Sequence, residues 1–126
     1  MELRAASSIP WTAAPSEHFT GRALFGPISR EGTVRMLGVD FDPGARTDWH
    51  SHPEGQLLYV VSGVGRVGDE DGTSVEIGAG DSVYAAPGQV HWHGAAPHSP
   101  MTHLSITTGG DTLWLPRKVT DDEYSS

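Results

Sequence analysis

Turn-forming residues interrupt every apolar stretch of this chain, and this feature narrows its fold more than any other. Sixteen glycines and nine prolines occur among 126 residues, and the apolar residues between them hardly ever repeat at helical spacing. What remains are short apolar or alternating runs, separated by turn sequences such as Asp42-Pro43-Gly44 and Pro87-Gly88. Runs of this length, with turns about every 8 to 12 residues, are typical of strands in sandwiches and barrels. The chain is therefore expected to be all-β.

The expected strands follow one another through the middle of the chain. They are residues 34–41, 56–61, 64–67, 73–77, 83–86, 90–94 and 101–107. One helical turn is expected within 119–126, where Thr120 can act as the N-cap and Glu123 stands at the third helical position. A length of 126 residues, without an internal repeat or a low-complexity stretch, predicts a single domain, residues 1–126.

The balance of charged residues and the lack of cysteine exclude several kinds of protein. The formal net charge is −8 and no basic cluster is longer than Arg117-Lys118, so nucleic acid is not an expected partner. Without cysteine there is no disulfide, thiolate metal site or thiol nucleophile. No apolar run reaches membrane-spanning length, and residues 1–16 lack the apolar region of a signal peptide. A cytoplasmic protein without a membrane partner is expected.

Histidine is concentrated in one part of the chain. Six of the seven histidines fall between residues 50 and 103. Side chains alternate between the two faces of a strand, so residues two apart point the same way. The residues that should share faces are His50 with His52, His91 with His93, Gln56 with Leu58 and Val60, and His103 with Ser105 and Thr107. Several polar side chains aimed into a small barrel would be costly without a ligand, and a metal ion is the simplest one.

Two motifs contain most of these residues. The first is Gly44-x5-His50-x-His52-x3-Gln56-x6-Gly63, and the second is Gly80-Asp81-x5-Pro87-Gly88-x2-His91. Together they resemble the cupin family, whose usual motifs are G-x5-H-x-H-x3-4-E-x6-G and G-x5-P-x-G-x2-H. The chain departs from them in having Gln56 where glutamate is usual, and in lacking the residue between the proline and the glycine of the second motif. The resemblance spans residues 44–94, and the strand pattern extends it to about 20–115.

The resemblance to cupins implies a single-domain double-stranded β-helix, a jelly-roll-like barrel with a metal ion at its open end. The ligands that it implies are His50, His52, Gln56 and His91. Nitrogen and oxygen ligands of this kind suit manganese, which we favour, and also iron, zinc, nickel or cobalt. The neutral amide of Gln56 would leave the ion more positive than glutamate would, at a cost in affinity. The alternative is a cupin without metal, in which Gln56 is hydrogen-bonded in the core.

A closer resemblance is to the small cupins that act as (R)-selective hydroxynitrile lyases, some of whose relatives are associated with carboxymuconolactone decarboxylases. The matching segments are 41–56, 80–83, 87–94, 101–104 and 119–121. This resemblance implies a metal-dependent lyase with a small-molecule substrate, in which His93 and His103 line the pocket and move protons. The alternative for both histidines is to support a ligand by a hydrogen bond. By analogy with small cupins, a homodimer is expected, with the segment around Trp11 contributing.

The remaining pocket walls are expected to be apolar. The residues placed there are Leu37, Val39, Phe41, Leu58, Val60 and Thr107. A pure core role is the alternative for the apolar ones. Leu37 is bulkier than its counterpart in the lyases and argues against a large aryl substrate. Asp48 is expected to be a solvated turn charge or an acceptor near the site. Trp49 and Trp92 point to the face opposite the expected ligands, so they should pack between sheets or at a subunit contact.

Four functions fit these features. The first is a hydroxynitrile-lyase-like enzyme, in which the ion acts as a Lewis acid and histidine as an acid or base. The second is an iron or manganese dioxygenase, which oxygen uptake would distinguish. The third is a cyclase or isomerase similar to those of polyketide synthesis. The fourth is a small-molecule-binding cupin without turnover.

Overall fold

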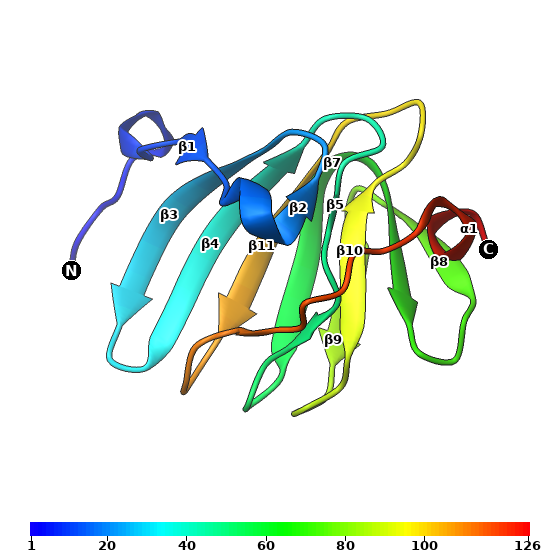
Figure 1. The fold of residues 1–126 in the computed structure, drawn as a ribbon. Helices are drawn as coiled ribbons and strands as arrows, with labels where there is room; N and C mark the ends of the chain where they lie inside the picture. Colours follow the sequence, from blue (N-terminus) through cyan, green and yellow to red (C-terminus); the bar gives the residue numbers. More distant parts are fainter.

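The computed structural model describes residues 1–126, and strands dominate it (Figure 1). In the first half of the chain the elements are η1 (Ala6–Ser8), β1 (Thr12–Ala13), η2 (Ser16–His18), β2 (Phe19–Thr20), β3 (Ala23–Glu31), β4 (Val34–Phe41), β5 (Arg46–Thr47) and β6 (His50–Ser51). In the second half they are β7 (Gln56–Asp69), β8 (Ser74–Gly78), β9 (Ser82–Ala85), β10 (His91–Ala95), β11 (Met101–Thr107), β12 (Leu113–Trp114) and α1 (Asp121–Ser125). The all-β prediction is confirmed.

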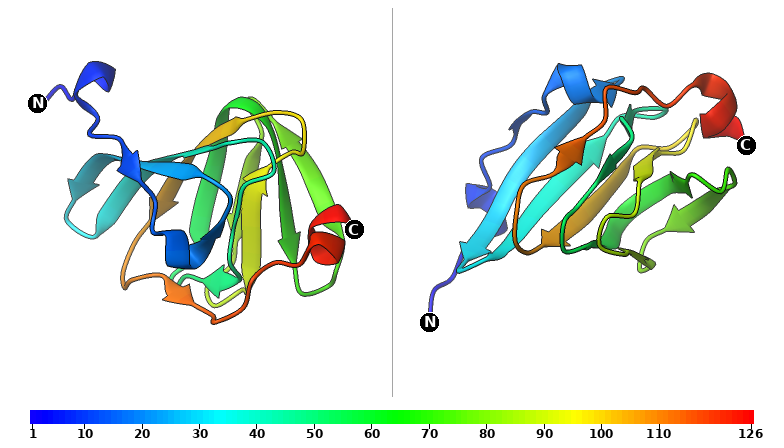
Figure 2. Two further views of the ribbon diagram at one scale, coloured as in Figure 1. Left: turned by 45° about the horizontal axis from the view of Figure 1, so that its top comes forward. Right: turned by 60° about the horizontal axis from the view of Figure 1, so that its bottom comes forward.

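The strands form one curled antiparallel sheet. Its order is β1-β3-β4-β11-β7-β10-β5-β2, while β8 and β9 pair with β7, and β6 pairs with β10 and β12. The two turned views show how the sheet curls, so that one face lines the inside of a half-barrel (Figure 2). Side chains at alternate positions of each strand therefore point either into this concave interior or out of it.

Strand β7 gives the sheet its curl. The expected strands 56–61 and 64–67 form this single strand, whose first half pairs with β11 and β9 and whose second half pairs with β10 and β8. Gly63 lies between the halves with φ 78°, and a Cβ built there would lie 1.9 Å from the Pro100 carbonyl oxygen. Glycine is thus required where β7 passes from one part of the sheet to the other.

The other predicted elements agree with the structure within a residue or two. The runs 34–41 and 101–107 coincide with β4 and β11, and 73–77, 83–86 and 90–94 correspond to β8, β9 and β10 with ends shifted by one residue. The helical turn is present as α1, and Thr120 and Glu123 form the expected reciprocal capping pair. Strand β3 and the two-residue strands were missed because they carry little regular alternation.

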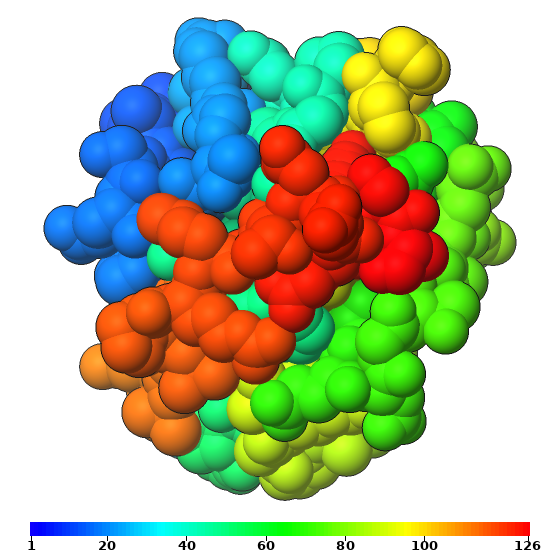
Figure 3. Space-filling model, turned by 45° about the vertical axis from the view of Figure 1, so that its right-hand side comes forward, coloured from blue at the N-terminus to red at the C-terminus, as the bar shows by residue number.

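Two clusters of apolar side chains form the buried core of the chain. The larger contains Phe19, Ala23, Val39, Phe41, Ala45, Val60, Ile77, Ala95 and Met101. The smaller contains Trp49, Trp92, Val119 and Tyr124, so both tryptophans pack against the C-terminal segment, whereas packing between sheets or at a subunit contact was expected. Arg46 donates to the Val119 carbonyl and forms an ion pair with Asp121, which fixes the C-terminal segment against β5. In Figure 3 this orange-to-red segment lies across the face of the molecule.

The outward face of the sheet carries a row of exposed apolar side chains. Leu57, Tyr59 and Tyr84 are 42%, 45% and 63% exposed, and the register places Ile106 beside Leu57 and Leu104 beside Tyr59. The Trp11 ring covers Gly26 and Gly38 at the edge of this face. A contiguous apolar row of this kind is a recognised mark of an interaction surface.

None of the helices in the structure has the length and apolar character needed to cross a membrane.

Candidate metal centre

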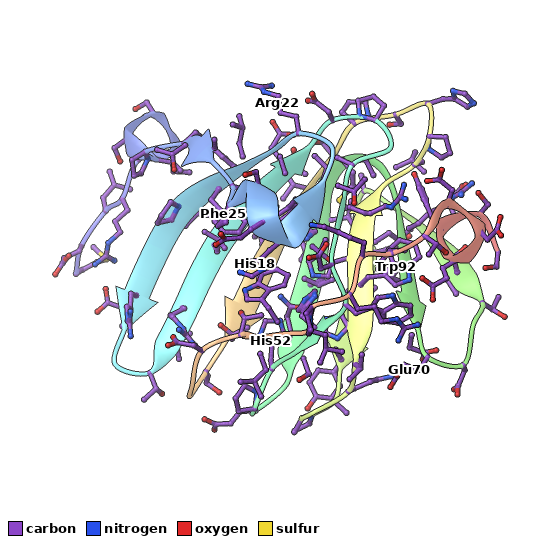
Figure 4. All side chains as sticks on the ribbon, viewed as in Figure 1. His18, Arg22, Phe25, His52, Glu70 and Trp92 are labelled. Carbon is purple, nitrogen blue, oxygen red and sulfur yellow. The ribbon has the colours of Figure 1, made fainter.

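Five histidines and one glutamine converge inside the open end of the half-barrel. They come from β6 and the turn after it (His50, His52), the start of β7 (Gln56), β10 (His91, His93) and β11 (His103). All six are buried, with at most 6% of any of these residues exposed. The alternation along the strands thus brings together the residues that the sequence placed on inward faces, and Figure 4 labels one of them, His52.

Strand pairing places the imidazoles against one another. His91 and His50 are directly opposite in the β10–β6 ladder, and their ring centroids lie 4.5 Å apart. Possible ligand atoms of His50, His91 and His93 all lie within 4.8 Å of one another. His52 is adjacent, with its ring centroid 5.1 Å from that of His50. The three-histidine group therefore shares His50 and His91 with the ligand set expected from the sequence, but contains His93 where that set has His52.

Backbone carbonyls fix the orientation of two of these rings. The Nδ1 of His50 lies 2.9 Å from the carbonyl oxygen of Asp48, and the Nδ1 of His91 lies 2.8 Å from that of Gln89. A carbonyl can only accept, so each Nδ1 carries the proton and donates it. The Nε2 atom of each ring is then unprotonated in the neutral form. Rings held in this way present a lone pair, which is how histidine ligands of metals are usually oriented.

The Gln56 amide brings a second lone pair to the same place. Its Oε1 lies 3.0 Å from Nε2 of His91, while its Nε2 donates to Ser105 Oγ at 2.7 Å. Because His91 has its proton on Nδ1, two acceptors face each other with no hydrogen between them. A cation between the two atoms would turn this repulsion into attraction. The donor set therefore fits a divalent transition metal.

Burial keeps this cluster uncharged. It lowers the pKa of His50 and His93 well below the usual value, and lowers that of His91 less strongly. The pKa of His52 falls to about 4, mainly through burial and also through the charges of His91 and Arg35. Burial also lowers the pKa of His103 to about 4. Neutral imidazoles are the form that binds metal, so the cluster is ready for an ion at neutral pH.

His93 and His103 form a hydrogen-bonded pair behind the cluster. His103 Nε2 lies 2.9 Å from His93 Nδ1, and both residues are almost completely buried. The outer atoms of the pair, His93 Nε2 and His103 Nδ1, have no hydrogen-bond partner, and the same is true of His52 Nε2. Unpartnered nitrogens in a buried site are costly unless they meet a ligand or a reacting group.

A cavity of about 470 Å³ opens beside the histidines, a size that suits a small organic molecule. Of the residues expected to line it, Leu37, Val39 and Thr107 do so, together with His50, His52, Gln56 and His93. Phe41 and Val60 belong to the apolar core instead, and Leu58 lines a second cavity of about 160 Å³ together with His91. His103 lines neither cavity and reaches the larger one only through His93.

Other residues of the cavity wall gave no signal in the sequence. Phe19, Phe25 and Trp114 supply aromatic surface, and the Trp114 ring centroid lies 4.7 Å from that of His50. Trp114 lies on β12, a two-residue strand that pairs with β6. Only the path of the C-terminal segment across the open end brings it there, and periodicity within the sequence could not have revealed that path.

Asp48 is not a solvated turn charge, which corrects one expectation. It is 3% exposed, and its Oδ1 lies 3.0 Å from Nζ of Lys118. A buried carboxylate needs such a partner because removing it from water is costly. The ion pair holds the backbone of Asp48, whose carbonyl in turn orients His50, so Asp48 and Lys118 connect the C-terminal segment to the centre.

Sequence comparisons identify the class of protein that has this fold and this cluster. The cupin domain profile matches residues 38–107. The chain belongs to the cupin family.

Within the family, particular proteins are similar over nearly the whole chain. An (R)-mandelonitrile lyase from Granulicella tundricola is 41% identical over 130 aligned positions, which cover 98% of each protein. A cupin-like protein from Thermotoga maritima, known as a crystal structure, is 37% identical and superimposes with a TM-score of 0.85 over 90% of each chain. The polyketide cyclase RemF from Streptomyces resistomycificus superimposes with a TM-score of 0.81 over 99% of this chain and 91% of its own, but at 14% identity it shares only the fold.

Proposed function

We propose that this cupin is a metal-dependent lyase that cleaves a cyanohydrin, or a similar hydroxylated small molecule, to a carbonyl compound. The observation that carries the proposal is the contact between His91 Nε2 and Gln56 Oε1, two acceptors that face each other beside the unpartnered His93 Nε2. The 41% identity to the (R)-mandelonitrile lyase supports the choice of reaction.

The residues that would hold the ion are His50, His52, Gln56 and His91, and manganese is the ion that we favour. When bound, such an ion supplies Lewis acidity, which stabilises negative charge as it develops on a substrate oxygen. Gln56 contributes a neutral oxygen, so this ligand set carries no formal charge to offset that of the ion. His93 is kept out of the proposed ligand set because the cupin motif gives the ligand position to His52, and the unpartnered Nε2 of His93 is assigned to proton transfer instead.

His93 and His103 are proposed to move the proton. His93 lines the cavity and has an unpartnered Nε2, so it can accept the hydroxyl proton of a substrate. As that O–H bond breaks, the bond from carbon to cyanide breaks and the carbonyl forms. His103 stabilises the charge on His93 through the 2.9 Å hydrogen bond, and the proton then returns to cyanide, which leaves as hydrogen cyanide.

The test is cyanide release from racemic mandelonitrile, and from the smaller acetone cyanohydrin that Leu37 would admit, by protein with a known metal content. We expect release by the wild type, and an initial rate reduced by about 100-fold or more in His93→Ala and His103→Ala, because general acid–base groups typically contribute that much. Both variants should keep their metal. The matched control is His98→Ala, an exposed histidine outside the cluster, which should leave the rate unchanged.

Two outcomes would contradict the proposal. Metal-loaded wild type that releases no cyanide from either cyanohydrin would exclude the reaction, and oxygen consumption with an aromatic substrate would then point to a dioxygenase. Loss of metal in His93→Ala, with metal retained in His52→Ala, would instead assign His93 as a ligand and leave His103 as the only candidate base.

We also propose that two copies of the chain pair through the outward row of Leu57, Tyr59 and Tyr84. Pairing would remove exposed apolar surface from water and cover part of the sheet. Trp11, which already lies at the edge of this face, would contribute to the contact.

A further inference from the structure

The charged side chains that line the larger cavity are all of one sign. Three arginines, Arg4, Arg30 and Arg35, are among the residues that line it, and no aspartate or glutamate is. In the whole chain the acidic residues outnumber the lysines and arginines by 16 to 8. A strongly acidic protein therefore surrounds a cavity whose own wall is basic, which raises the local concentration of small anions.

Arg30 and Arg35 form an unusual pair. They are directly opposite each other in the β3–β4 ladder, and both line the cavity. Like charges that are opposite each other in an antiparallel pair repel, and they destabilise the strands unless something neutralises them. Arg30 makes no ion pair or side-chain hydrogen bond within the chain. Arg4, by contrast, is already paired with Glu2 and Glu31, so it contributes less free positive charge.

Arg35 is held in place at the edge of the site. Its guanidinium donates to the carbonyl oxygens of Gly109 and Gly110 at 3.1 and 2.6 Å and pairs with the exposed carboxylate of Asp111 at 3.1 Å. Its Nε is buried and has no partner. The neutral carbonyls fix the direction of the side chain without removing its charge, and Asp111, 98% exposed, offsets that charge only weakly.

We propose that the substrate of this cavity carries a carboxylate, which Arg30 and Arg35 bind while the hydroxyl or carbonyl end of the molecule lies at the histidines. The proposal rests on the proposed function, since it takes the cavity beside the metal centre as the substrate site. Phe19, Phe25 and Trp114 line the wall and would enclose the apolar middle of such a molecule. A neutral cyanohydrin would use the histidine end of the cavity and leave the arginines unengaged.

The test is calorimetric titration with two probes of nearly equal shape, the 4-(hydroxymethyl)benzoate anion and neutral 4-(hydroxymethyl)benzamide, whose hydroxyl lies at the opposite end of an apolar ring from the carboxylate or amide. Wild type is expected to bind the benzoate about tenfold more tightly, because the charge-assisted pairing of arginine with carboxylate is available only to the anion. Arg30→Gln and Arg35→Gln should each remove a large part of this preference and leave binding of the benzamide unchanged. Arg30→Gln is the cleaner variant, since its side chain makes no contact that folding could lose.

The matched control is Arg22→Gln. Arg22 does not line the cavity, and it lies at the outer edge of the molecule, away from His52 (Figure 4). This variant changes the net charge equally and should keep the full preference for the benzoate. Equal binding of the two probes by wild type, no binding of the benzoate, or an equal loss in Arg22→Gln would overturn the proposal.

Metal-loaded and chelator-treated protein are titrated side by side, since a bound ion would also attract a carboxylate. If the chain holds no metal, the proposed lyase function fails, but a preference for the benzoate that depends on Arg30 still supports the anion site. If cyanide release is found and the preference is absent, the proposed function stands and the carboxylate is excluded.

Discussion

At the scale of single residues, the candidate metal centre depends on the direction in which each ligand atom presents its lone pair. Backbone carbonyls direct the lone pairs of His50 and His91 inward, and Ser105 performs the same task for Gln56. By accepting the amide Nε2–H at 2.7 Å, Ser105 leaves Oε1 facing His91. A glutamate at position 56 would need no partner to fix its orientation, because both of its oxygens can bind a cation. The glutamine thus explains why β11 places a buried serine within hydrogen-bond distance of it, two residues before Thr107, the direct partner of Gln56 in the ladder.

Replacing Ser105 by alanine should therefore weaken metal binding without touching a ligand. The amide of Gln56 would then be free to rotate, and the affinity for manganese should fall by roughly 10-fold or more, as is typical for groups that orient ligands. Competition with a fluorescent chelator measures this affinity directly. Ser82→Ala, an exposed serine on β9, is the control. An unchanged affinity in Ser105→Ala would show that Ser105 does not set the orientation of Gln56.

At the scale of elements, β7 links the two parts of the sheet and places Gln56 at its first residue. Its bend at Gly63 lets the same strand pair with β11 beside His103 and with β10 beside His91 and His93. The expected break at 62–63 was a bend within a continuous strand. A sequence shows that glycine is present, but whether it ends a strand or bends one depends on the partner strands.

Gly63→Ala should destabilise the chain more than Gly44→Ala. The two glycines have nearly equal φ, 78° and 79°, so both substitutions incur a backbone cost of about 1 kcal/mol or more. Only at Gly63 would the new Cβ meet the Pro100 carbonyl, since nothing lies within 4 Å at Gly44. Urea unfolding of the two variants provides the comparison. Equal losses in free energy of unfolding would contradict the role given to the bend.

At the scale of the whole molecule, the buried histidines make the metal-free protein sensitive to acid. The unfolded chain takes up protons below about pH 6.5, whereas burial lowers the pKa of His52 and His103 to about 4 in the folded chain. Between these values the unfolded state binds more protons, so stability falls as the pH decreases. His103 alone should reduce the free energy of unfolding by on the order of 2 kcal/mol between pH 7 and pH 5.

Urea unfolding of chelator-treated protein at pH 7, 6 and 5 tests this dependence on pH. The decline should be smaller in His103→Gln, which lacks one of the titrating groups. A free energy of unfolding that is equal at pH 7 and pH 5 would contradict the neutral, buried state of the cluster.

The outward apolar row predicts the state of association. Tyr59→Glu should convert a dimer to a monomer at micromolar concentration, because it places a charge in the centre of the proposed contact. Val75→Glu, at an exposed valine on β8 that lies outside the row, should not. Sedimentation velocity distinguishes the two states. A wild type that is monomeric throughout would exclude pairing through this face.

The sequence predicted those parts of the molecule that depend on local alternation. The period-two spacing of side chains predicted which residues of β7, β10 and β11 face inward. The two motifs predicted that residues about 40 positions apart in the chain lie close together. Alternation cannot show how a chain is routed, so the position of Trp114 and the pairing of Asp48 with Lys118 were not foreseen. Nor could it show that Phe41 and Val60 lie behind the cavity, since inward-facing residues near the closed end fill the core.

The central claim is that the buried histidines and Gln56 hold a metal ion, and elemental analysis of protein purified without added metal tests it most directly. Wild type, Gln56→Ala and His91→Ala are compared, with His98→Ala as the control. We predict about one divalent transition metal per wild-type chain, with a strong loss in the first two variants and none in the control. Wild type that contains no metal and takes up none when manganese, iron or zinc is supplied would contradict the account.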